Sequence, residues 1–302
     1  MCRLLNEITV FLEDNGFACS RQIRYDMNVI SVKTADGRYS RIILPLEINS
    51  TTPEEAAQKS RMAADSICLI HSLEGYPLII TEDRWRSQKK MMEARLLAHL
   101  ESFSQAYARN CEVRRIEKAE AQDFLNRHHS YGYVACRYRY GLFLKRHTGH
   151  NAAGFAQAGY EGEQGKDIGR LIAVATFSNA RRWIKDGKEI RSYEWTRYAS
   201  LPEMRVSGGM GKLLKAFIKE VKPDDIMSYS DLEWSEGYVY KTLGFMEEGI
   251  KEAVEFVVDK NQWKRFPIKA SITDRKDNKM DTPLFFRNFG SRKFRLKLTD
   301  YK

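Results

Sequence analysis

Three short motifs in the second half of the chain carry residue types that suit group-transfer chemistry. The first is a turn containing Gly208, Gly209 and Gly211, followed directly by apolar residues at helical spacing. Glycines let the backbone come close to a ligand, and the bare amides and positive dipole end of a helix N-terminus form a phosphate site. A plain strand-to-helix connection would use the same glycines, so the turn has to be interpreted together with the two motifs that follow it.

The other two motifs add polar groups and a tyrosine. Tyr229, Ser230 and Asp231 end a short apolar stretch that is predicted to be a buried strand, and open α/β sheets place their sites at such strand ends. Residues 237–245 (GYVYKTLGF) then predict a helix that carries Tyr240 and closes into a new strand. Because residues 192–202 favour a strand before the glycine turn, the expected order is strand, glycine turn, helix, strand and helix.

This series resembles the core of the GNAT acyltransferases. The segments TRYASLP, SGGMGKLL, SYSD and GYVYKTLGF are also similar to a group of GNAT-related phage proteins, which includes the Mu Mom adenine-modification protein and domains attached to phage homing-type endonucleases. The similarity covers residues 82–245 and, more faintly, the C-terminal strand. In that group the acidic tripeptide is usually Tyr-Ala-Asp, so Ser230 is a departure from its pattern.

The resemblance implies transfer of an acyl group from acetyl-CoA, or a related acyl-CoA, to an amine. Tyr240 would be the acid for the departing thiolate, Asp231 the base or the substrate anchor, and His129 the histidine of the family's FL…H…G pattern. Val206 stands where conventional acetyltransferases usually carry Arg or Gln, which makes the cofactor assignment less secure than the fold. The cofactor-binding residues implied are Val206, Ser207, Gly208, Gly209, Gly211 and Lys212; the catalytic and substrate-binding residues are Asp231, Tyr240, Tyr229, His129, Arg197 and Trp234.

The composition is that of a soluble globular protein. Of the 302 residues 43% are hydrophobic and 30% charged, and no run of about 18 apolar residues could span a bilayer. Acidic residues within the first 14 positions argue against a signal peptide. The five cysteines lack CxxC spacing, which favours reduced thiols in a cytoplasmic protein over a disulfide framework or a cysteine zinc site.

The net charge of +10 is concentrated in the segment 259–302, which has thirteen Lys and Arg against five Asp, a net charge of +8. Such a segment attracts a polyanion, so DNA is the expected partner, although a solvated basic face is the alternative. Its last part, SRKFRLKL, alternates basic and apolar residues as an edge strand does. Arg181, Arg182 and Trp183 lie in a predicted hairpin that could contact a nucleic acid or be a plain solvated hairpin.

The first hundred residues predict the order αβββαβα, with a capping-box helix that starts at Thr52-Pro53. This order resembles the PD-(D/E)xK nuclease fold, whose third strand carries Glu-x-Lys. Here that strand offers Glu47-Ile48-Asn49, and Asp26 or Asp36 would have to be the other metal ligand. Because the lysine is missing, we interpret the domain as a degenerate relative of the nucleases.

The predicted fold is therefore α/β: a GNAT-like mixed central sheet with flanking helices in residues 109–302, preceded by a nuclease-like domain in residues 1–108. Residues 147–168 are expected to form a flexible insertion, in which His147 and His150 lack a third metal ligand, so no metal is predicted. The leading function is acyl transfer to a nucleic-acid base, which would have to be flipped out of a duplex. The alternatives are acetylation of a protein or small-molecule amine, and a non-catalytic nucleic-acid-binding module.

Overall fold

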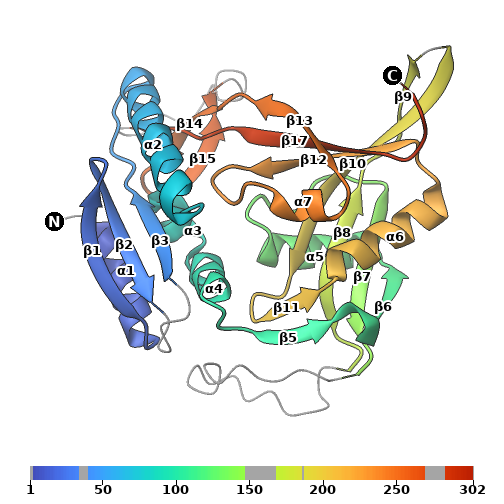
Figure 1. The fold of residues 1–302 in the computed structure, drawn as a ribbon, viewed down its shortest axis with the longest axis horizontal. Coiled ribbons are helices and arrows are strands. Elements are labelled where there is room, and N and C mark those ends of the chain that lie inside the picture. The colour runs from blue at the N-terminus through green and yellow to red at the C-terminus, as the bar shows by residue number, and fades with distance from the viewer. Residues whose placement is uncertain (1–2, 34–39, 147–167, 186, 269–282, 302) are drawn as a thin grey trace. The chain divides into compact units, whose positions relative to one another are not determined.

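The fold is taken from a computed structural model, which describes residues 3–33, 40–146, 168–185, 187–268 and 283–301 (Figure 1). The chain forms two compact units. Unit 1 contains Met1–Leu96, Ser230–Gly237 and Gly249–Arg292, and unit 2 contains Leu97–Tyr229, Tyr238–Glu248 and Lys293–Lys302. This division differs from the predicted domains 1–108 and 109–302, because two late segments of the chain make most of their contacts with the N-terminal elements.

Unit 1 begins with the element order that the sequence predicts, except that the last helix is divided at Gln88. The elements are α1 (Arg3–Asp14), β1 (Ala18–Arg24), β2 (Met27–Lys33), β3 (Ser40–Leu46), α2 (Pro53–Glu74), β4 (Leu78–Thr81), α3 (Glu82–Ser87) and α4 (Lys89–His99). Strands β1, β2 and β3 form an antiparallel meander, and α2 connects β3 to the parallel strand β4. The apolar residues of these strands pack against one face of α2 to form the core.

The start of α2 confirms the predicted capping signal. The Thr52 hydroxyl accepts a hydrogen bond from the Glu55 amide at 3.2 Å, and Pro53 occupies the first helical position. The Glu55 carboxylate in turn accepts from the Thr51 amide at 2.9 Å, one residue earlier than in the standard capping box. Gly75 ends the helix with φ at +84°, a conformation that residues with a side chain rarely adopt.

A second, three-stranded sheet completes unit 1. Its order is β15–β14–β16, formed by β14 (Glu255–Asp259), β15 (Lys264–Pro267) and β16 (Leu284–Arg287). All three strands belong to unit 1, although they come late in the chain. Strand β16 packs on α2, and a bridge joins Phe285 to Ser50.

Unit 2 is built on a large mixed sheet with flanking helices, as predicted. The order is β13–β17–β12–β10–β8–β7–β6, with β9 pairing with β10. The strands are β6 (Cys111–Arg115), β7 (Tyr138–Leu144), β8 (Leu171–Phe177), β9 (Arg181–Lys185), β10 (Lys188–Ser200), β12 (Asp225–Asp231), β13 (Met246–Lys251) and β17 (Ser291–Lys297). Helices α5 (Lys118–His128) and α6 (Gly209–Val221) pack on the sheet, while β5 (Ser104–Tyr107) and β11 (Met204–Ser207) form a small parallel pair.

Aromatic rings fill the centre of unit 2. Phe217 of α6 stacks on Phe177 of β8 with ring centroids 3.9 Å apart, and Trp195 of β10 stacks on the same phenylalanine. All three side chains are at most 3% exposed. These ring contacts pack α6 against β8 and β10 in the core of unit 2.

The C-terminal strand corrects a prediction. Strand β17 lies between β13 and β12, so SRKFRLKL is an interior strand and not an edge strand. Its basic residues are paired within the fold: Lys293 with Glu248 at 2.8 Å, and Arg295 with both Glu248 and the fully buried Asp225. These side chains hold the sheet together, and they are therefore a poor basis for predicting DNA contact.

Some predictions fall on residues outside the described part of the chain. These are the insertion 147–168, of which only Ile168 is described, with its His147 and His150, the candidate metal ligand Asp36, and residues 269–282 of the C-terminal segment. Within the described residues, none of the helices is both long and apolar enough to cross a membrane.

Candidate active site

The glycine turn of unit 2 sits where the sequence places it, between β11 and α6. Gly208 is the N-cap of α6 with φ at +76°, in the left-handed region, and its carbonyl accepts the first helical hydrogen bond from the Lys212 amide at 3.0 Å. The amides of Gly209, Met210 and Gly211 precede that bond, and the cap residue has no side chain to satisfy them. This end of the helix can therefore donate several hydrogen bonds to an anion.

Two of the glycines are required by close packing. A Cβ atom on Gly209 would lie 3.0 Å from Val206 Cγ1, and one on Gly211 would lie 3.2 Å from Leu243 Cδ2. Leu243 directly follows helix α7 (Tyr238–Thr242), which carries Tyr240. The absence of a side chain at Gly211 thus brings the first turn of α6 beside the tyrosine helix.

The parallel pairing of β10 with β12 stops partway along both strands. Only three residue pairs form, from Ser192↔Asp225 to Glu194↔Met227. Beyond them β10 continues to Ser200 and pairs with β8, while β12 continues to Asp231. The two central strands therefore separate after Glu194, directly beside the elements that carry the glycine turn and Tyr240.

A short hydrogen-bonded chain occupies the point where the strands separate. Ser228 of β12 donates to the carbonyl of Trp195 at 3.0 Å, and its Oγ lies 2.9 Å from the hydroxyl of Tyr240. A serine hydroxyl has one hydrogen, so Ser228 donates to either the Trp195 carbonyl or the Tyr240 oxygen at one time, and its donation to Tyr240 favours the phenolate. Burial raises the pKa of Tyr240 and the Ser228 bond partly offsets this, so the phenol is a neutral proton donor.

Arg197 and His129 lie in a second group within unit 2. The Arg197 guanidinium donates to the Gly132 carbonyl at 3.0 Å and lies 5.9 Å from the Tyr131 ring centroid. Burial lowers the pKa of Arg197, and the nearby carboxylate of Glu194 opposes that effect. His129 ends α5, and its Nδ1 accepts from the Tyr131 amide at 3.1 Å. The loop 129–132 thus connects His129 with Arg197, two candidate site residues that lie far apart in the sequence.

The side chains of other predicted cofactor residues have structural partners. Lys212 Nζ donates to the carbonyls of Ala108 at 2.8 Å and Cys111 at 2.5 Å. Its ammonium group therefore holds the start of β6 and does not serve as a phosphate ligand in this structure. Ser207 Oγ accepts from Gln105 at 3.1 Å, and Val206 is buried. What remains available to an anion at this turn is therefore its backbone amides.

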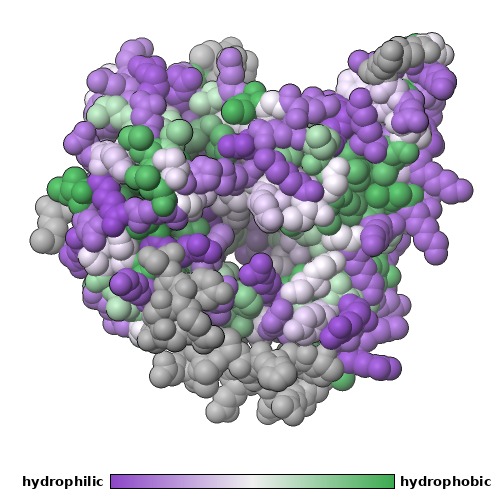
Figure 2. Space-filling view, viewed as in Figure 1, coloured by the Kyte–Doolittle hydropathy of each residue, from purple (hydrophilic) through white to green (hydrophobic). Residues whose placement is uncertain are grey.

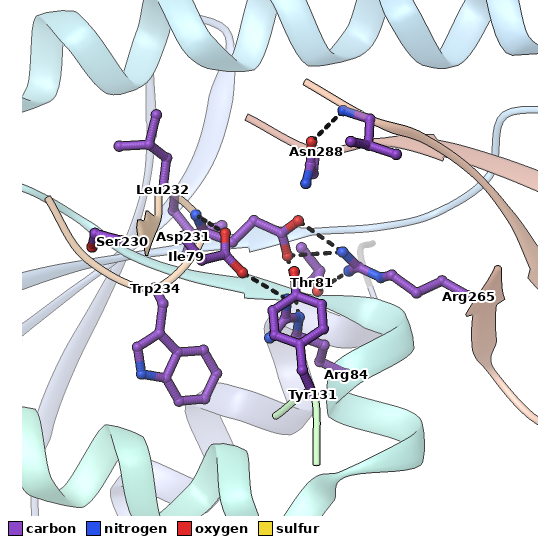
Figure 3. Close-up of polar contacts among 12 residues, drawn as sticks. Ile79, Thr81, Arg84, Tyr131, Ser230, Asp231, Leu232, Trp234, Arg265 and Asn288 are labelled. Atoms are coloured by element: carbon purple, nitrogen blue, oxygen red, sulfur yellow. Dashed lines mark hydrogen bonds and ion pairs between the residues drawn. The ribbon is translucent and has the colours of Figure 1, made fainter. Parts of the chain in front are cut away.

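Asp231 and Trp234, predicted as base and substrate contact, belong to unit 1. The Asp231 carboxylate forms an ion pair with Arg84 at 3.0 Å and accepts from the Glu233 amide at 2.9 Å (Figure 3). The Trp234 ring lies 4.2 Å from the Arg95 guanidinium and 5.5 Å from that of Arg84. The contacts of Asp231 and Trp234 thus hold the 230–237 segment against α3 and α4.

Arg265 lies at the centre of this ionic cluster, as Figure 3 shows. Its guanidinium contacts Asp83 at 2.8 Å and Glu233 at 2.7 Å, and it also donates to the Thr81 hydroxyl. Asp83 and Glu233 are 2% and 1% exposed. Burial alone would raise the pKa of Asp83, but the charge and hydrogen bonds of Arg265 outweigh it and lower that pKa. Burial raises the pKa of Glu233 although Arg265 opposes it.

The nuclease-like residues of unit 1 border a cavity of about 230 Å³ between the ends of β2 and β3, helix α2 and strand β16. Asp26, Glu47 and Asn49 line it. Lys59 Nζ donates to Asn49 Oδ1 at 2.6 Å and to Glu55 Oε1 at 2.7 Å. Among the described residues there is no group of three or more His, Cys, Asp or Glu that could hold a metal ion.

We therefore expect purified protein with Mg²⁺ or Mn²⁺ to leave supercoiled plasmid DNA uncut. Two carboxylates without a third ligand hold a divalent cation weakly, and the lysine of this region is neutralised by Glu55. Gel electrophoresis after prolonged incubation is the measurement. Metal-dependent cleavage that is lost in Glu47→Ala would contradict the interpretation of this region as degenerate.

Comparison with known proteins gives the following similarities. No protein-family model and no curated protein matches the sequence. Similar solved structures include a conserved Enterococcus faecalis protein described as a probable N-acyltransferase (15% identity, 51% of this chain and 36% of that chain covered, TM-score 0.32). A GNAT-family acetyltransferase from Bacillus anthracis matches at 12% identity, over 62% of this chain and 95% of that chain, with a TM-score of 0.31.

Mycobacterium abscessus Eis1 matches at 15% identity over 50% of this chain and 34% of that chain, with a TM-score of 0.30. The present chain spans about a third of the length of the Enterococcus and Mycobacterium proteins. Identities and TM-scores of this size assign no function to the present chain.

Proposed function

We propose that unit 2 is an acyl-CoA-dependent N-acyltransferase domain. The observation that carries this proposal is the separation of β10 from β12 after three residue pairs, with Ser228 and Tyr240 hydrogen-bonded at the opening. The uncapped amides of Gly209 to Gly211 lie beside the tyrosine helix, as the packing of Gly211 on Leu243 requires. An anion-binding helix end and a neutral phenol beside the same strand opening fit a long ligand with a diphosphate at one end and a reacting group at the other.

Different residues of unit 2 act in different steps of the proposed reaction. When bound, an acyl-CoA supplies the thioester whose carbonyl carbon the amine attacks, with formation of the C–N bond and cleavage of the C–S bond. The Gly209–Gly211 amides bind the diphosphate, and the Tyr240 hydroxyl gives its proton to the departing sulfur. Glu194, which ends the parallel ladder, takes the amine proton in place of Asp231, because the Asp231 carboxylate is already paired with Arg84.

We further propose that the acceptor amine belongs to a nucleic-acid base. This rests on the similarity of TRYASLP, SGGMGKLL and GYVYKTLGF to the GNAT-related phage proteins, and on the basic character of the chain. A protein or small-molecule amine is the alternative acceptor. Mass analysis of DNA nucleosides from cells with and without the protein distinguishes them, since only a base acceptor adds a new modified nucleoside.

Donor binding is tested at Met210, in the first turn of α6. Met210→Glu places a carboxylate at the positive end of the helix, where it stabilises the helix but repels an anionic ligand. We expect the Kd for acetyl-CoA to rise at least about tenfold, whereas Met210→Gln, of the same shape without the charge, should stay within about twofold. Gly209 is less suitable for substitution, since a Cβ there crowds Val206.

Isothermal titration calorimetry with acetyl-CoA measures both variants against the wild type. Unit 2 should retain its thermal unfolding midpoint in the two variants, because residue 210 is only half-buried. No binding heat for the wild type, or the same Kd for Met210→Glu and Met210→Gln, would contradict an acyl-CoA site at this turn.

A further inference from the structure

Strands β9 and β10 form a two-stranded ribbon that extends beyond the larger sheet. The pairing runs from Arg181↔Ser192 to Lys185↔Lys188, and β9 has no other strand partner among the described residues. All five residues of β9 are exposed. In Figure 1 the ribbon projects from its own unit near the C-terminus, and in Figure 2 its surface is coloured mainly as hydrophilic. A projecting ribbon of this kind buries no core of its own, so its surface is free for a partner.

The charge of the ribbon is positive and only partly neutralised. Arg182 pairs with Glu189 at 3.2 Å. Within the part of the chain that the structure describes, Arg181, Lys185 and Lys188 have no carboxylate within ion-pair distance. The basic residues of β17 differ in this respect, because carboxylates of the same unit neutralise Lys293 and Arg295. Three cations of the ribbon are therefore available to a polyanion, whereas Lys293 and Arg295 of the C-terminal strand are not.

The register places the free cations and an aromatic ring on one face. Residues directly opposite in an antiparallel pair share a face, and residues two apart along a strand share it as well. Arg181, Trp183 and Lys185 of β9 thus lie on the same face as Lys188 of β10. Trp183 is 39% exposed. The same face also carries Ile190 and Ser192 of β10, which are 3% and 1% exposed, so the β10 side of this face is covered at the base of the ribbon. The exposed part of the face consists of the β9 side chains and Lys188, with positive charge at both ends and a flat apolar group between them.

Beside Trp183, on the same face, the base of the ribbon is anchored to the sheet. Its cross-strand neighbour Ile190 is 3% exposed, and the Arg295 guanidinium lies 5.8 Å from the Trp183 ring centroid. Arg191 in β10 bonds to Asp224 and to the Lys222 carbonyl. The base of the ribbon is therefore held in place, and its exposed face keeps one orientation relative to unit 2.

We propose that this ribbon binds duplex DNA in the major groove. The major groove of B-DNA, about 12 Å wide, admits a two-stranded β-ribbon, whereas the deep and narrow major groove of an RNA duplex does not. Five residue pairs enclose four intervals and span roughly 14 Å, or about four base-pair steps of 3.4 Å, so cations at both ends reach phosphates across the groove. This binding requires neither the acyl donor nor transfer, and it supplies the surface that a nucleic-acid acceptor would need.

The test is the salt dependence of binding to a fluorescein-labelled 20-base-pair DNA duplex, followed by anisotropy with the full chain between 50 and 200 mM NaCl. We expect Lys185→Glu/Lys188→Glu to weaken binding at least tenfold at 50 mM NaCl. It should also flatten the slope of log K against log salt by about two, since each phosphate contact contributes about 0.9. Trp183→Ala should weaken binding without changing the slope.

The matched control is Lys118→Glu/Lys215→Glu, which makes the same charge change at exposed positions of α5 and α6. It should keep the wild-type slope to within half a unit. Equal effects of the two double variants would overturn the proposal, because binding would then follow net charge alone.

Competition experiments with unlabelled polyanions identify which of them the ribbon binds. Unlabelled duplex DNA should displace the probe more effectively than duplex RNA or polyglutamate at equal charge concentration. Displacement by either competitor as effective as that by DNA would overturn the assignment to a DNA groove. Because the assay contains no acyl donor, its failure leaves the acyltransferase proposal standing, and failure of acetyl-CoA binding leaves this proposal standing.

Discussion

Replacing Arg265 by methionine is expected to lower the free energy of unfolding of unit 1 by about 3–5 kcal/mol. The substitution leaves Asp83 and Glu233 as buried carboxylates with most of their compensation removed, since each is at most 2% exposed and each contacts the guanidinium. The measurement is urea denaturation followed by the fluorescence of Trp85 and Trp234, both of which lie in unit 1.

The control adds Asp83→Asn and Glu233→Gln to Arg265→Met. If the loss comes from uncompensated charge, neutralising both carboxylates should restore part of it. If the loss comes only from the lost contact of the guanidinium with the Phe286 ring, the triple variant should be no more stable than Arg265→Met. A loss below about 1 kcal/mol in Arg265→Met would refute the central role of this residue.

The same cluster predicts a pH dependence. Arg265 lowers the pKa of Asp83, so the stability due to that carboxylate is present above its unfolded pKa and is lost as the pH falls through its lower folded pKa. In Arg265→Met, burial is left to raise the pKa of both carboxylates, and protonation then relieves the penalty. The difference in unfolding free energy between wild type and variant should therefore be larger at pH 7 than at pH 4.

The cluster also explains which part of the site could not be predicted from the sequence. Asp231 ends a strand, which favours a catalytic role by position alone, but its partner Arg84 lies 147 residues earlier in the chain. Arg265 lies in a strongly basic segment, where composition favours a surface contact with DNA, yet it is buried among carboxylates. Local patterns report strand ends and charge density, and they carry no information about such long-range pairs.

Local signals predicted elements that depend on neighbouring residues. The Thr52 cap and the glycine turn before α6 each act within a few residues, and the structure has both of them. The position of β17 was missed for the opposite reason. Its alternation of basic and apolar residues is the pattern of an edge strand, but the carboxylates of Glu248 and Asp225 neutralise its charges inside the sheet.

Ser228 is a residue of the proposed site that the motifs did not reveal. The motif that predicted a site was Tyr229-Ser230-Asp231, which begins one position later. Ser228 and Ser230 are two residues apart and therefore share a face of β12, so the period of the strand does not distinguish them. Their positions along the strand do: Ser228 lies at the Tyr240 hydroxyl, whereas Ser230 bonds to the carbonyl and hydroxyl of Ser235. Which serine meets the tyrosine depends on the packing of α7.

Tyr240→Phe should slow acyl transfer by about 10²–10⁴-fold while the Kd for acetyl-CoA stays within about twofold, because the hydroxyl acts on the departing sulfur and the ring only packs. The ring keeps its contacts with Phe294 and Trp195 after the change. Tyr238→Phe is the matched control: it makes the same chemical change on the same helix, at a side chain that is 76% exposed. Thiol release from acetyl-CoA, with duplex DNA or a panel of amines as acceptor, gives the rate.

Ser228→Ala separates a proton-transfer role of Tyr240 from a packing role. Because burial raises the pKa of Tyr240 and the Ser228 hydrogen bond lowers it, removal of Ser228 should move the alkaline limb of the rate profile to higher pH. The acid must keep its proton, so activity is present below that pKa and is lost as the pH rises through it. If Tyr240 only packs in the core, Ser228→Ala should leave the alkaline limb of the pH–rate profile at the same pH. Two results would remove Tyr240 from the mechanism and leave solvent as the proton source for the thiolate. One is a rate for Tyr240→Phe within threefold of the wild-type rate. The other is an alkaline limb of the pH–rate profile that Ser228→Ala does not move.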